Sequence, residues 1–153
     1  MSVAFRREGD DEHLEPKFEI PLPPGPNLVT ARGKALIDAR VAELEAEVAA
    51  AAPERVEALK RDLRYWQTRQ VTAELVPAPS GETVEIGTTV KFRQNGKLRE
   101  LTIVGDDEAD PAAGRVSFAS PLARALMRAE EGELVDWAGK EAAIEVVAIT
   151  VAG

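Results

Sequence analysis

The chain lacks cysteine, has a single histidine, and only 5% of its 153 residues are aromatic. Without cysteine it forms no disulfide, thiolate metal site or redox centre, and one imidazole leaves almost no room for Cys- or Ser-His-type catalysis. No stretch approaches the roughly 18 consecutive apolar residues of a membrane-spanning helix, and the N-terminus has no apolar signal-peptide core. We therefore expect a cytoplasmic protein without membrane contact.

The chain also has fewer basic than acidic residues. Lys and Arg number 19 against 27 Asp and Glu, which gives a formal net charge of -8. This balance argues against binding of a nucleic-acid backbone as the main function and favours a protein partner. Apolar residues make up 44% and charged residues 30% of the chain, as is typical of a folded globular protein.

Composition divides the chain into three segments. Residues 1–27 hold five prolines, which neither continue a helix nor suit a central strand, so we expect a flexible arm, either extended or a disordered tail. Residues 28–75 are rich in Ala, Leu, Glu and Arg, and residues 76–153 hold most of the Gly, Thr and Val. The prolines at 77 and 79 mark the boundary between these two segments.

The middle segment has two apolar seams of helical spacing. Thr30 suits the N-cap of a first helix, and Pro53 suits the first turn of a second. The seams are those of a coiled coil: Ile37, Val41, Leu44 and Val48, then Val56, Leu59, Leu63 and Trp66. Two seams joined by a short break predict an antiparallel helical hairpin whose arms, at about 20 residues each, are roughly 30 Å long.

The last segment has the pattern of a small antiparallel β domain. Strand-like runs at 88–92 and 98–104 flank Asn95 and Gly96, the strongest short hairpin signal. Ser120 and Pro121 suit the cap and first residue of a short helix. Further strands are expected at 115–119, 134–137 and 143–151. We therefore predict an α+β protein, a helical hairpin followed by a β domain with one short helix.

Three blocks of this segment carry a family resemblance. VGDDEAD at 104–110, SPLARAL at 120–126 and EEGE at 130–133 occur in this order. Together they resemble the C-terminal domain of the bacterial GreA/GreB transcription elongation factors, although Glu133 stands where that family often has Asp. VTARG at 29–33, with Leu36, is similar to the start of the family's first helix. The resemblance covers roughly residues 28–151.

The resemblance implies an FKBP-like fold for the β domain and RNA polymerase as the partner. Family members bind at the rim of the polymerase secondary channel, insert the hairpin toward the active centre, and leave the chemistry to the polymerase. It also implies that nucleic acid, including DNA, is met only indirectly within the transcription complex, and we expect a monomer. The implied docking residues are Asp106, Asp107, Glu108, Asp110, Ser120, Pro121, Leu122 and Ala123.

The hairpin tip departs from the family. Cleavage-stimulating members carry a G-D-L-S-E-N type loop there, whose acids help to hold the second Mg²⁺ of the polymerase, and no such loop occurs between residues 46 and 58. The hairpin is also shorter than theirs. Glu47, Glu54 and Glu57 could present carboxylates near the tip, yet solvated helix faces are the simpler interpretation. We expect no intrinsic cofactor, at most Mg²⁺ shared with the polymerase, and little cleavage activity, as in Rnk-like relatives.

Other interpretations are weaker. The acidic run at 106–110 lacks the alternation of an EF-hand, so we do not expect calcium binding. An FKBP-like enzyme or chaperone is the alternative function, but Phe92, Phe118 and Trp137 are few aromatics for a prolyl-isomerase pocket. Arg61, Arg64 and Arg69 form a basic stripe that we interpret as pairing with acids of the hairpin.

Overall fold

The structure is a computed structural model that describes residues 19–152, so residues 1–18 of the predicted arm lie outside the described residues. The described chain forms two compact units, one of residues 19–25 and 37–72, the other of residues 26–36 and 73–152. This division differs from the predicted segments because residues 26–36 and 73–75 pack with the sheet rather than with the hairpin. No helix within residues 19–152 combines the length and apolar character needed to cross a membrane.

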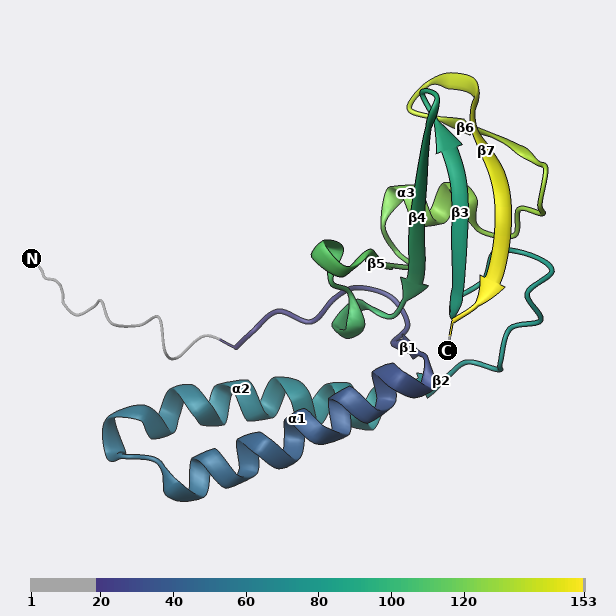
Figure 1. Cartoon of the computed structure of the whole chain (residues 1–153). Coiled ribbons are helices and arrows are strands. Elements are labelled where there is room, and N and C mark those ends of the chain that lie inside the picture. The colour runs from purple at the N-terminus through teal and green to yellow at the C-terminus, as the bar shows by residue number, and fades with distance from the viewer. Residues whose placement is uncertain (1–18, 153) are drawn as a thin grey trace, which may run out of the picture. The chain divides into compact units, whose positions relative to one another are not determined.

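The helical hairpin is confirmed (Figure 1). Helix α1 (Ala31–Ala50) and helix α2 (Pro53–Thr72) are joined through Ala51 and Ala52. The amide of Gly33 donates to Thr30 Oγ1 at 3.0 Å, so Thr30 is the predicted N-cap. Four seam residues, Ile37, Val41, Leu44 and Leu59, are buried, and the other seam residues are half-buried.

Residues 19–25 have neither helix nor strand, and residues 19–22 lie along α2. The Arg64 guanidinium donates two hydrogen bonds to the Glu19 carboxylate, at 2.8 and 2.7 Å. Ile20 and Leu22 share a groove with Tyr65 of α2. This part of the predicted arm is therefore attached to the hairpin by one ion pair and a small apolar contact.

A five-stranded sheet forms most of the second unit. Its strand order is β5-β4-β3-β7-β6. The strands are β3 (Thr88–Gln94), β4 (Lys97–Val104), β5 (Arg115–Ser117), β6 (Leu134–Trp137) and β7 (Lys140–Val151). Asn95 and Gly96 form the predicted β3–β4 turn, with left-handed φ angles of 52° and 75°. Helix α3 (Pro121–Leu126) buries Ala123 and Leu126 against Phe92, Ile103 and Ile144.

The sheet differs from the predicted antiparallel arrangement in one strand. β5 runs parallel to β4, with Thr102 opposite Arg115 and Val104 opposite Ser117. The 3-10 turns η2 (Asp106–Glu108) and η3 (Pro111–Ala113) lie between these strands. They bring the chain back beside Thr102, so that β5 runs in the same direction as β4. The predicted α+β class is otherwise confirmed.

A two-stranded parallel pair was not predicted. β1 (Leu28–Val29) lies beside β2 (Glu74–Leu75), with Leu28 opposite Glu74. A Cβ at Gly105 would collide with the Leu28 carbonyl oxygen, so the segment after β4 approaches β1 closely. This contact places the start of α1 next to η2.

Candidate functional site

The acidic run predicted for docking is held to the start of α3. Ser117 Oγ donates to Asp106 Oδ1 at 2.6 Å and accepts from the amide of Ala119 at 3.0 Å. The amide of Ser120 donates to the Ser117 carbonyl at 3.0 Å. Ser120 Oγ in turn accepts from the amide of Ala123 at 3.4 Å, which confirms the predicted cap of α3. η2 and the N-terminus of α3 therefore form one continuous hydrogen-bonded surface.

Six of the eight predicted docking residues have exposed atoms on this surface. Asp110 and Pro121 are exposed, and the other four are half-buried. We call these six the docking edge: Asp106, Asp107, Asp110, Ser120, Pro121 and Leu122. The edge has three carboxylates next to a proline and a leucine.

Glu108 and Ala123 are not available for docking. Ala123 is fully buried in the core of the sheet unit. The Glu108 side chain is only 4% exposed, although its three acidic neighbours in the run are not buried. The 3-10 turn directs this one carboxylate inward, so its prediction as a docking residue is corrected.

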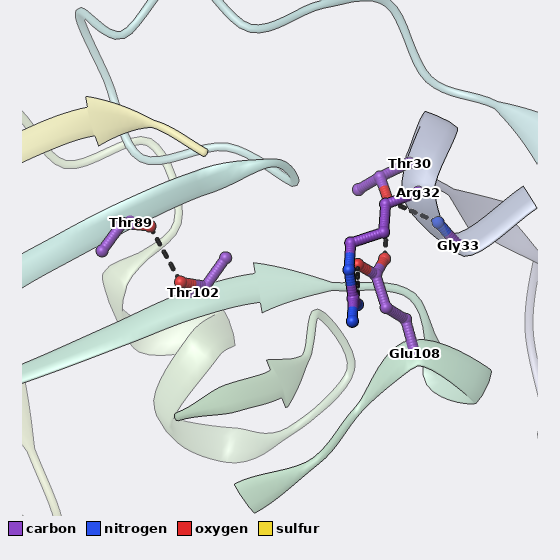
Figure 2. A network of polar contacts seen from close by, with 6 residues as sticks. All are labelled: Thr30, Arg32, Gly33, Thr89, Thr102 and Glu108. Atoms are coloured by element: carbon purple, nitrogen blue, oxygen red, sulfur yellow. Dashed lines mark hydrogen bonds and ion pairs between the residues drawn. The ribbon is translucent and has the colours of Figure 1, made fainter. Parts of the chain in front are cut away.

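Glu108 joins η2 to the start of α1 (Figure 2). Thr30 Oγ1 donates to Glu108 Oε1 at 2.5 Å, and Arg32 Nη1 donates to Glu108 Oε2 at 2.9 Å. A Cβ added at Gly33 would lie 2.9 Å from Glu108 Oε1. A larger residue at this position of VTARG would therefore displace the Glu108 carboxylate from its present place. In the sequence, the only sign of this network is the spacing of Thr30 and Gly33 in VTARG. That spacing does not identify Glu108 as the acidic partner.

Two arginines of the predicted basic stripe differ in exposure. Arg69 is buried, at 3% exposed, and its pairing with an acid of the hairpin stays a prediction. Arg64 is exposed and pairs with Glu19 of the arm rather than with an acid of the hairpin. Arg69 follows the seam residue Trp66 by three positions, which places it on the seam face, whereas Arg64 directly follows Leu63 and lies on another face.

The tip acids are exposed but do not converge. Glu54 and Glu57 lie in the exposed start of α2, and the Glu47 side chain is 47% exposed, with a carboxylate oxygen 3.8 Å from Arg40. The link between the helices is made by two alanines. Within residues 19–152, no group of three or more His, Cys, Asp or Glu side chains is arranged to hold a metal ion.

Comparisons with known proteins identify relatives of this chain. The family model described as "Transcription elongation factor, GreA/GreB, C-term" matches residues 78–151. The transcription elongation factor GreA of Nitratidesulfovibrio vulgaris (strain DP4) is 36% identical over 109 residues, 67% of each chain. GreA of Pseudomonas putida is 34% identical over 139 residues, 88% of this chain and 84% of that protein. The solved GreA/GreB factor from Nitrosomonas europaea aligns with 83% of this chain and 99% of its own, at 19% identity and a TM-score of 0.41.

Proposed function

Because this chain belongs to the GreA/GreB family of transcription elongation factors, we propose that it binds RNA polymerase at the secondary channel and modulates elongation or backtracked complexes. Family factors act with RNA polymerase, and the polymerase carries out the chemistry. The observation that supports this role most directly is the docking edge, in which hydrogen bonds through Ser117 hold the acidic turn to the start of α3.

The chemistry of the docking edge indicates the kind of surface that it contacts. Asp110 and Pro121 are exposed, and Leu122 is half-buried beside them. Apolar contacts supply most of the affinity of an interface, while charges around them set orientation and partner choice. A basic or apolar helical element of the polymerase therefore complements this edge. The hydrogen bonds to Asp106 and Ser120 favour binding with little rearrangement.

The hairpin is proposed to occupy the channel without stimulating strong transcript cleavage. Mg²⁺ requires oxygen ligands in near-octahedral geometry at about 2.1 Å, so acids must point together at the tip itself. Here the turn consists of Ala51 and Ala52, and Glu47 lies next to Arg40. Helices of 20 residues extend only about 30 Å. Both the chemistry and the reach of the tip favour a factor that blocks the channel or competes for it over one that stimulates transcript cleavage.

The remaining parts of the proposal concern assembly and location. One chain contains both the docking edge and the hairpin, so a monomer suffices for this role. With a net charge of -8, the chain meets nucleic acid only inside the transcription complex. A polymerase partner places the protein in the cytoplasm.

A backtracked elongation complex tests the proposed role of the tip. The full chain is added with Mg²⁺, and shortening of the labelled transcript is followed over time. We expect shortening at the polymerase's own rate, unchanged by Glu47→Ala, by Glu54→Ala or by the control Glu141→Ala, which removes an exposed acid of β7. Fast Mg²⁺-dependent shortening that is lost with Glu47→Ala or Glu54→Ala, but kept with Glu141→Ala, would contradict the proposal.

A further inference from the structure

A cleft of about 700 Å³ lies within the sheet unit. Its lining comes from the first turn of α1, the segment that follows α2, the paired ends of β3 and β4, and the end of β7. The volume falls in the range of small-molecule sites, roughly 300–1,000 Å³. No part of the proposed function uses this cleft, because the docking edge and the hairpin tip are formed by other residues.

The walls of the cleft are mainly apolar. Val76, Pro77, Pro79, Ile86 and Val104 contribute to them. The two threonines on the sheet side add little polarity, because the hydroxyls of Thr89 and Thr102 are hydrogen-bonded to each other at 2.8 Å (Figure 2). Such walls favour a ligand with an apolar body.

The charged residues of the lining are two arginines and one glutamate. The glutamate, Glu108, accepts from Arg32 and is almost fully buried, so its charge is already paired. The Arg115 side chain makes no hydrogen bond or ion pair with any residue in the described part of the chain. The cleft therefore has an excess of one positive charge in a protein whose net charge is -8.

We propose that this cleft binds a small organic anion, an apolar body that carries one sulfonate, carboxylate or phosphate group. The apolar body would lie against the proline and valine walls, and the acid group would contact Arg115, with the partly exposed Arg32 nearby. A guanidinium binds such oxyanions through two parallel hydrogen bonds. The proposal goes beyond polymerase binding and does not depend on it.

Binding of anilinonaphthalene sulfonate to the full chain tests the proposal. This dye is an aromatic sulfonate whose fluorescence rises in apolar surroundings, and phenylnaphthylamine provides the same rings without the charge. We expect the sulfonate to bind more tightly than the neutral analogue. The amide signals of Gly87 and Thr102, two residues of the lining, are expected to shift in NMR spectra.

Matched variants separate the charge from the apolar walls. Arg115→Gln is expected to weaken sulfonate binding about tenfold and leave the neutral analogue unchanged, whereas Arg115→Lys retains most of the binding. Ala78→Phe, in the exposed segment after α2, fills the cleft and weakens both probes. Arg124→Gln, which removes an exposed arginine of α3 outside the cleft, changes neither.

Three results would overturn the proposal. The first is equal affinity of the charged and neutral probes. The second is an Arg115→Gln variant that binds the sulfonate as tightly as the original chain. The third is a set of NMR shifts confined to the groove between residues 19–22 and α2. None of these results would bear on polymerase binding, so failure of this inference is distinguishable from failure of the proposed function.

Discussion

At the scale of single residues, the decisive feature is one carboxylate that differs from its neighbours. The acidic run at 106–110 suggests a solvated surface throughout, yet Glu108 is buried against Thr30 and Arg32. Sequence alone could not separate this residue from the others, because the direction of each side chain depends on the 3-10 turn. The acceptor for the Thr30 hydroxyl also comes from a residue 78 positions away.

This packing predicts a coupling between Gly33 and Glu108. Alanine is favoured over glycine in helices by up to about 1 kcal/mol, but at position 33 its Cβ would press on Glu108 Oε1. We expect Gly33→Ala to give no gain in the free energy of unfolding in the original chain. In a Glu108→Ala background the same change is expected to stabilise by up to about 1 kcal/mol.

Urea denaturation of the four chains in this double-mutant cycle measures the coupling. Arg32 is 46% exposed, so water can solvate its guanidinium when Glu108 is removed, and the background variant is expected to fold. An identical effect of Gly33→Ala in both backgrounds would show that the carboxylate does not restrict this position.

At the scale of elements, local sequence patterns predicted the helices and turns well, but they did not predict the pairings between segments that are distant in the sequence. The seams of α1 and α2, the Asn95–Gly96 turn and the Ser120 cap depend on neighbouring residues, and all are confirmed. β1 and β2 have two residues each, so neither has a periodicity to detect. β5 is equally short, and its parallel direction follows from the turns before it. The same limit explains why the cleft lined by Arg115 was not anticipated.

The contact between the arm and α2 predicts a dependence on pH. The hydrogen bonds from Arg64 lower the pKa of Glu19 from its usual 4.5. Because the pKa of Glu19 is lowered in the attached state, its carboxylate stabilises that state at pH values above the usual pKa of glutamate. This stabilisation is lost as the pH falls through the lowered pKa. We therefore expect residues 19–22 to remain attached to α2 at neutral pH and to detach in acid.

An NMR titration of the Glu19 carboxyl carbon measures this effect. In Arg64→Gln the pKa of Glu19 is expected to rise toward its usual value, and the Tyr65 signals, which report the shared groove, should lose their acid-dependent change. Arg55→Gln, an exposed arginine near the start of α2, is the control. Equal Glu19 pKa values in the original chain and in Arg64→Gln would contradict the ion pair.

At the scale of the whole molecule, membership of the GreA/GreB family is confirmed, as the blocks at 104–133 and the start of α1 indicated. The chain is accordingly a transcription elongation factor of this family, whose members act with RNA polymerase and are not enzymes in their own right. Its departures from the expected pattern concern particular sites: an alanine turn at the tip, and a buried glutamate within the acidic run.

Binding of the full chain to purified RNA polymerase tests the central claim most directly. Fluorescence anisotropy at moderate ionic strength compares the original chain with Asp110→Lys, in the docking edge, and Glu141→Lys, on the β7 strand away from β5. The two substitutions change the net charge equally. We predict saturable binding that Asp110→Lys weakens roughly tenfold and Glu141→Lys leaves unchanged. Absence of binding, or equal weakening by both variants, would contradict docking through this edge.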